Sequence, residues 1–176
     1  MVRIVTDSTS DLPPEVARDL GITVVPVILH FGTQSYRDGV DMAPEKLYER
    51  MVSGPVHPTT SSPAPGEFAE VYRRLSRETD EILCLTISSK LSGIHQAATT
   101  GKQAFGGKTR IEVVDTQLPT MCLGLLATLA AREARDGKSL DDLLTTVRGA
   151  IPRSYGMALL DSARYVLKGG RLGKSG

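Results

Sequence analysis

The chain has 176 residues, of which 40% are apolar and 23% charged, as in an ordinary globular protein with a sizeable core. Its 21 basic and 20 acidic side chains leave a net charge of +1, so no overall field attracts nucleic acid or an anionic membrane. No run of about 18 apolar residues predicts a membrane span. The two separated cysteines predict neither a disulfide framework nor a zinc site, and they suit a reducing cytoplasm.

The N-terminal half alternates short apolar runs with segments of helical period. Residues 2–7 read as a buried strand, and residues 22–31 as a second strand in which Pro26 indicates an edge position or a bulge. A helix is expected between these two strands, with Asp11 as its N-cap and Gly21 as its C-terminal stop. The next two helices are expected over residues 44–54 and 66–78.

The second half continues the alternation of strands and helices. Strands are expected over residues 81–88 and 110–116, and helices over residues 92–105, 119–137 and 139–151, the last capped by Ser139. Strands separated by helices predict the α/β class, with a mostly parallel sheet flanked by helices on both faces.

Two parts of unequal size are expected along the chain. Residues 1–152 are predicted to form the α/β lobe just described. The closing stretch RYVLKGGRLGKSG begins like a helix and then stops with nothing to pack against. Residues 153–176 are therefore predicted to be the start of an incomplete C-terminal lobe.

Three loops rich in hydroxyl side chains stand where an open α/β sheet binds ligands. TDSTSD (residues 6–11) and SSKLSG (residues 88–93) each follow a predicted strand, and PTTSSPAPG (residues 58–66) leads into a helix. Hydroxyls together with free backbone N–H groups at a helix start can hold a carboxylate or a phosphate. Serine and threonine are also favoured at caps and turns for local reasons, so spacing alone leaves both interpretations open.

Catalytic chemistries fit these residues less well. Asp7 is placed like the nucleophile of an aspartyl phosphatase, but Thr9 stands where that chemistry needs a second carboxylate. Ser92 and His95 could share a helix face, although no carboxylate is evidently placed to orient the imidazole. The three histidines lack ligand-like spacing, so no metal site is predicted.

Four motifs taken together resemble the DegV family of bacterial fatty-acid-binding proteins. They are VRIVTDSTSDLPPEVARDLGITVVPV, PTTSSPAPGEF, SSKLSG and YVLKGGRLGK, in that order, so the resemblance runs from Arg3 to Lys174. It implies an N-terminal α/β lobe with a parallel sheet, a second α/β lobe, and a fatty acid such as palmitate with its carboxylate at the junction. It also implies a carrier without catalysis or cofactor, which presents the acid to an ATP-dependent fatty acid kinase for acyl phosphate formation.

The resemblance also assigns the site residues. The family's Thr-Ser pair falls on Thr60 and Ser61, and its L-S-G serine on Ser92, followed by Gly93. Thr60 and Ser92 would donate hydrogen bonds to the fatty-acid carboxylate. Arg171, in GGR, matches an arginine near the head group or the surface that faces the kinase.

Several points remain open beside this assignment. Ser62 stands where the family usually has Gln, and Ile94-His95 where it usually has Thr-Tyr, which affects the details of the head-group site. Family members also continue into most of a second lobe, so this 176-residue form is expected to bind fatty acids poorly or not at all. The alternatives are a phosphotransferase or phosphatase that uses the Asp7 loop, and a regulatory domain that binds only protein.

Overall fold

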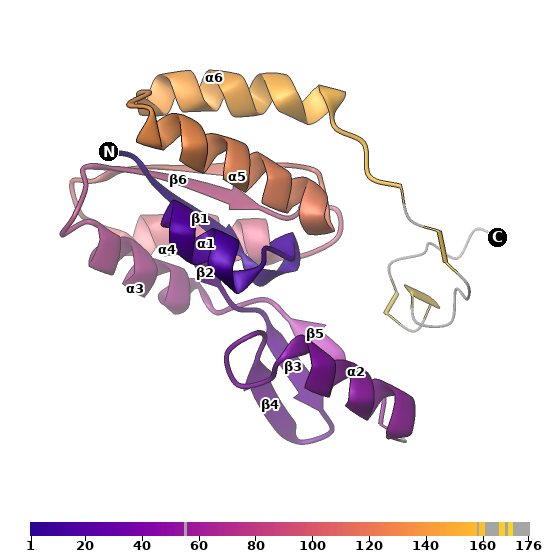
Figure 1. The fold of residues 1–176 in the computed structure, drawn as a ribbon. Coiled ribbons are helices and arrows are strands. Elements are labelled where there is room, and N and C mark those ends of the chain that lie inside the picture. The colour runs from indigo at the N-terminus through magenta and orange to yellow at the C-terminus, as the bar shows by residue number, and fades with distance from the viewer. Residues whose placement is uncertain (55, 158, 161–165, 168, 171–176) are drawn as a thin grey trace.

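The protein consists of a main α/β layer structure and a smaller sheet that projects from one end of it (Figure 1). The computed structural model describes residues 1–54, 56–157, 159–160, 166–167 and 169–170. Within those residues no helix is both long and apolar enough to cross a bilayer.

The main sheet has four parallel strands in the order β2-β1-β6-β7. Its strands are β1 (Arg3–Asp7), β2 (Thr23–Val25), β6 (Glu81–Thr86) and β7 (Arg110–Asp115). Strand β6 lies between two neighbours and is almost wholly buried, as the apolar run ILCL within it predicts. The carboxyl ends of these strands therefore meet at one edge of the sheet.

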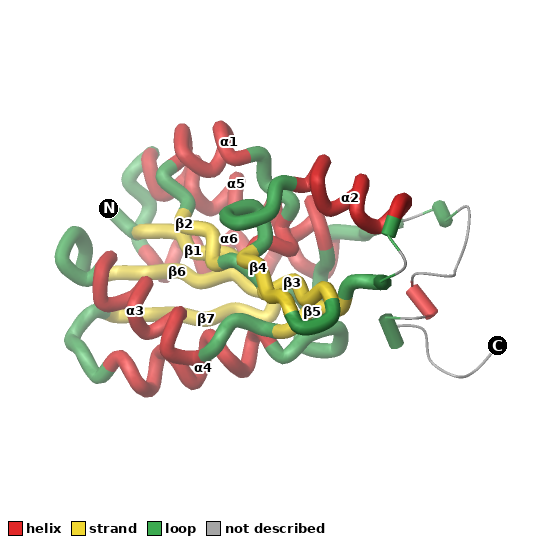
Figure 2. Tube along the Cα trace, turned by 90° about the horizontal axis from the view of Figure 1, so that it is seen from below, coloured by secondary structure: helices red, strands yellow, loops and turns green. Residues whose placement is uncertain are grey.

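Helices cover both faces of this sheet, as expected (Figure 2). One face carries α1 (Pro14–Leu20), α5 (Thr120–Arg135) and α6 (Leu140–Ala150); the other carries α3 (Pro65–Leu75) and α4 (Ile94–Phe105). One apolar cluster fills the space between the sheet and both helix layers. The predicted α/β class and flanked parallel sheet are confirmed.

The smaller sheet was not anticipated. It is antiparallel, in the order β4-β3-β5, and α2 (Pro44–Ser53) covers it over a small core. Its strands are β3 (Ile28–Phe31), β4 (Gln34–Arg37) and β5 (Thr59–Ser61). The prediction of a single strand over residues 22–31 is therefore wrong. The chain leaves the main sheet after β2 and enters the smaller sheet at β3. Pro26 lies between the two strands, because proline has no backbone N–H to donate to the hydrogen bonds of a sheet. The hydroxyl row before α3, expected as a loop, contributes β5.

Of the three predicted helix caps, two are confirmed and one is wrong. Ser139 caps α6, accepting a hydrogen bond from the Asp142 N–H. Gly21 ends α1 in the left-handed conformation with φ 67°. Asp11 is not an N-cap: it closes the short 3-10 helix η1 (Ser8–Ser10) with φ 52°, and α1 begins after Pro13, whose fixed φ suits a helix start without a side-chain cap. A second 3-10 turn, η2 (Ile151–Arg153), follows α6.

Helices α3 and α4 pack closely because Gly101 has no side chain. A Cβ at Gly101 would lie 2.6 Å from Phe68 Cβ and 2.7 Å from the Pro65 carbonyl oxygen. We expect Gly101→Ala to lower the free energy of unfolding by about 1–3 kcal/mol, since backbone atoms and the Cβ of a buried phenylalanine cannot move aside cheaply. Urea denaturation measures this change.

Gly149 provides the matched control for that substitution. It is an exposed glycine of α6, and an added Cβ would meet nothing within 4 Å. Gly149→Ala should leave stability unchanged or raise it by up to about 1 kcal/mol, because alanine restricts the unfolded chain. Equal stabilities of the two variants would contradict the close-packing argument.

Candidate functional site

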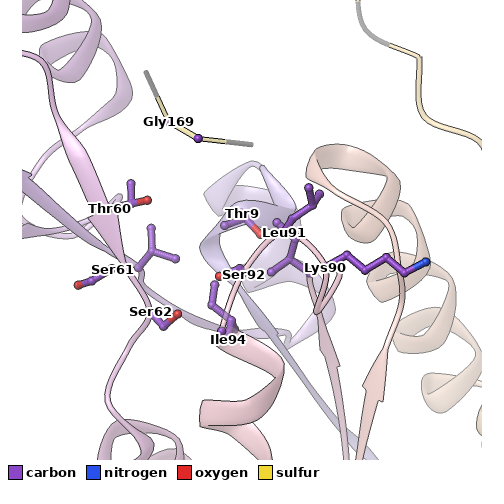
Figure 3. Close-up of a pocket in the computed structure, with 13 residues that line it drawn as sticks. Thr9, Thr60, Ser61, Ser62, Lys90, Leu91, Ser92, Ile94 and Gly169 are labelled. Atoms are coloured by element: carbon purple, nitrogen blue, oxygen red, sulfur yellow. The ribbon is translucent and has the colours of Figure 1, made fainter. Parts of the chain in front are cut away.

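A cavity of about 630 Å³ lies where the carboxyl ends of the main sheet meet the smaller sheet (Figure 3). Hydroxyl-bearing, apolar and glycine residues line most of it. The lining residues are Thr9, Val27, Thr60, Ser61, Ser62, Ile87, Lys90, Leu91, Ser92, Gly93, Ile94, Gly169 and Gly170.

All three hydroxyl-rich loops contribute to this cavity. Thr9 comes from η1 after β1, residues 90–94 follow β6, and residues 60–62 are the last two residues of β5 and the residue after it. Thr60, Ser61, Ser92 and Gly93, four of the five predicted site residues, therefore line one cavity although up to 33 positions separate them. The fifth, Arg171, lies outside the described residues.

Some hydroxyls at the cavity already have partners within the protein. The Thr9 hydroxyl donates to Asp7 Oδ1. The Ser61 Oγ is 2.8 Å from His30 Nε2, and Figure 3 shows it on the side of β5 that points away from the cavity. Of the predicted pair Thr60 and Ser61, the structure therefore leaves Thr60 with the available hydroxyl.

Three other hydroxyls, those of Thr60, Ser62 and Ser92, have no hydrogen-bond partner among the described residues. Figure 3 shows Ser62 and Ser92 facing one another across the cavity, with Thr60 above them. A hydroxyl without an acceptor among the described residues is able to donate to a bound anion.

Ser62 is the functional candidate that sequence reasoning missed. A Cβ added at Gly93 would lie 3.3 Å from Ser62 Oγ, so this hydroxyl closely approaches the residue that precedes α4. The first turn of a helix leaves backbone N–H groups without carbonyl acceptors, which favours an anion there. The signal was present in the four-residue hydroxyl row, but it could not show which members of the row face inward.

The described lining of the cavity contains no acidic side chain, and its one basic side chain does not face the hydroxyls. Of the described lining residues only Lys90 is charged, and its side chain extends away from the hydroxyls in Figure 3. No carboxylate lines the cavity among those residues, so no acidic side chain of the described lining would contact a negatively charged ligand directly. Recognition by the described residues would therefore depend on neutral donors.

Asp7 is buried and bonds two residues that line the cavity, Thr9 and Ile87. Its side chain is fully buried; Oδ2 accepts from the Ile87 N–H at 3.0 Å and Oδ1 from the Thr9 N–H at 3.1 Å. Burial raises the pKa of Asp7, against the lowering effect of these hydrogen bonds. The carboxylate thus ties the loop after β1 to the loop after β6, and both of these loops line the cavity.

Other candidate reactive groups are likewise engaged or buried. His95 Nδ1 is 3.1 Å from the Thr86 hydroxyl, not paired with Ser92. Burial raises the pKa of Cys84 to about 12, which keeps it a thiol at neutral pH. Among the described residues, no group of three or more metal-ligating side chains gathers in one place.

Comparison with known proteins places this arrangement in a family. A family model described as an uncharacterised protein of the DegV family matches residues 1–176. The chain belongs to the DegV family. A DegV domain-containing protein of Caldanaerobacter subterraneus is 38% identical over 174 residues, which cover 99% of this chain and 61% of that protein. The chain thus spans about 60% of the length of this DegV relative.

Solved structures of DegV proteins share the fold. A DegV family protein from Thermus thermophilus, described by its fatty acid binding, is 38% identical with a TM-score of 0.77, over 86% of this chain and 53% of that one. A stearic acid-binding protein from Eubacterium ventriosum is 31% identical with a TM-score of 0.79, over 84% of this chain and 52% of that one. The parallel sheet flanked by helices is therefore shared with fatty-acid-binding proteins.

Proposed function

We propose that the protein binds a long-chain fatty acid by its carboxylate, with the Thr60, Ser62 and Ser92 hydroxyls as donors. The observation that carries the proposal is that these three hydroxyls, which have no hydrogen-bond partner among the described residues, gather at one cavity whose described lining holds no carboxylate. The fatty-acid-binding relatives at more than 30% identity support the choice of ligand. Ser61 and Gly93 shape the same cavity, and Arg171 is proposed to supply positive charge near the head group.

The carboxylate head and the acyl tail of the fatty acid would contribute to binding in different ways. Each hydrogen bond to a charged group contributes about 1.5–3 kcal/mol. A palmitate tail of about 15 methylenes contributes on the order of 12 kcal/mol gross at ~0.8 each when it is buried. The tail would therefore dominate affinity, and the hydroxyls would decide which end of the ligand lies at the junction.

A carrier without catalysis fits the described residues better than an enzyme. A phosphatase-like reaction would need Asp7 to reach a substrate, yet its side chain is fully buried and bonded to backbone N–H groups. Among the described residues, no histidine is hydrogen-bonded to the Thr60, Ser62 or Ser92 hydroxyl: His95 is bonded to Thr86, and His30 to Ser61, whose hydroxyl points away from the cavity. Both observations favour ligand binding over nucleophilic attack.

The proposal extends to a partner and to the domain arrangement. A carrier that holds a fatty acid by its carboxylate would present that group to an ATP-dependent fatty acid kinase in the cytoplasm, where the acyl phosphate forms. Residues 1–152 would form the lobe described above, ending after α6 in η2, and residues 153–176 would begin the second lobe.

Lipid extraction tests the proposed function directly. The protein, purified at its full natural length from a bacterial host, is extracted with organic solvent and the extract is examined by mass spectrometry. We expect a long-chain fatty acid at roughly one per protein chain, since a mostly buried tail dissociates slowly. An empty extract, together with no uptake of added palmitate, would favour the enzyme or the protein-binding alternative.

A further inference from the structure

The polar face of the smaller sheet carries a row of three hydrogen-bonded side chains, one from each strand. His30 on β3 lies between Ser35 on β4 and Ser61 on β5. Its Nδ1 is 2.8 Å from Ser35 Oγ, and its Nε2 is 2.8 Å from Ser61 Oγ. A neutral imidazole donates through one ring nitrogen and accepts through the other, so it can bond both hydroxyls at once.

Strand β5 depends on this row more than the other strands do. It has three residues, all exposed, and it lies at the edge of the sheet with β3 as its one partner strand. Short exposed edge strands are held weakly by backbone pairing alone. The His30–Ser61 contact is the side-chain hydrogen bond that ties β5 to the middle strand.

The alternation of a strand connects this anchor with the cavity. Ser61 and Thr60 are successive residues of β5, so their side chains lie on opposite faces of the sheet. Holding Ser61 on the His30 face therefore holds Thr60 toward the cavity, where its hydroxyl has no partner among the described residues. Rotation of β5 would turn the Thr60 hydroxyl away from a ligand.

We propose that His30 is a positioning residue for the head-group site: through Ser61 it fixes the direction in which Thr60 donates. This inference rests on the proposed fatty-acid function. His30 itself does not line the cavity. It acts by pre-organising a donor, which lowers the cost of ordering β5 when the carboxylate binds.

The test is palmitate affinity measured for His30→Ala in the protein at its full natural length. One net hydrogen bond corresponds to about a three- to ten-fold loss of affinity. Thr59→Ala is the matched control, because Thr59 lies on the same strand, does not line the cavity, and has no side-chain hydrogen bond among the described residues. It should bind as the wild type does. His30→Gln, which can still bond one serine, should lose less than His30→Ala.

A double-variant cycle separates positioning from general destabilisation. If His30 acts through Thr60, then His30→Ala has no further effect in a Thr60→Ala background. A purely structural role would lower affinity by the same factor in both backgrounds, and that result would overturn the inference. So would wild-type affinity in both His30 variants. Thermal unfolding of each variant confirms that it is folded at the assay temperature.

The cycle also distinguishes this inference from the proposed function. If the wild type binds palmitate and Thr60→Ala weakens it while His30→Ala does not, the positioning role fails and the carrier function stands. If the wild type binds no fatty acid, both fail together.

Discussion

A Thr60→Ala, Ser92→Ala double variant, at the protein's full natural length, is expected to bind palmitate about 100-fold more weakly or worse. Both hydroxyls line the cavity and have no partner among the described residues, so each is available to donate to a carboxylate. Two hydrogen bonds to a charged group, at about 1.5–3 kcal/mol each, correspond to a loss of at least about two orders of magnitude. Isothermal titration or competition with a fluorescent fatty acid measures it.

The side chains involved allow a graded version of this experiment. Ser62→Ala should cause a loss similar to that of either single variant, because its hydroxyl faces Ser92 across the same cavity. Thr59→Ala should have no effect, since Thr59 lies outside the cavity lining. A double variant that stays within about three-fold of the wild type would show that these hydroxyls do not hold the head group.

Residues 1–176 purified alone are expected to bind palmitate at least about 100-fold more weakly than the Thermus thermophilus DegV protein in the same assay. The apolar side chains among the described lining residues are Val27, Ile87, Leu91 and Ile94; most of the remaining lining residues bear hydroxyls or are glycines. These four cannot bury a tail of about 15 methylenes, each of which contributes about 0.8 kcal/mol when buried.

Chain length gives this second prediction a sharper form. If residues 1–176 hold only the carboxylate end, octanoate and palmitate should bind with affinities within a few-fold of each other. A tail buried by these residues would instead increase affinity about four-fold per methylene. Such a steep dependence, or palmitate affinity within ten-fold of the relative, would contradict the prediction. A cooperative thermal transition is the control for folding.

The main sheet could be predicted from the sequence because its signals are local. Strand β6 is an unbroken apolar run buried on both faces, and α6 begins at Ser139 with acidic residues in its first turn. The α/β alternation then restricts the topology to a parallel sheet with helices on both sides. These patterns repeat along the chain and reinforce one another.

The smaller sheet could not be predicted in the same way. Strand β5 is three residues of Thr and Ser, all exposed, with no apolar period to mark it. It exists because β3 offers it a partner about 30 positions earlier in the sequence, and that pairing depends on tertiary contact. Pro26 was interpreted as an edge position or a bulge: β2 is indeed an edge strand, but the crossover into a second sheet could not be predicted, because one sequence cannot show which of two sheets a strand joins.

The amino-acid sequence by itself determined the fold class, the three hydroxyl-rich loops and the family resemblance, because each of these depends on residues that are adjacent in the chain. Only the tertiary structure decided which hydroxyls have partners: Ser61 is bonded to His30 and Thr9 to Asp7, while Thr60, Ser62 and Ser92 line the cavity with no hydrogen-bond partner among the described residues. Hydrogen-bond satisfaction is a property of neighbours in space, and neighbours in space are set by how the two sheets meet.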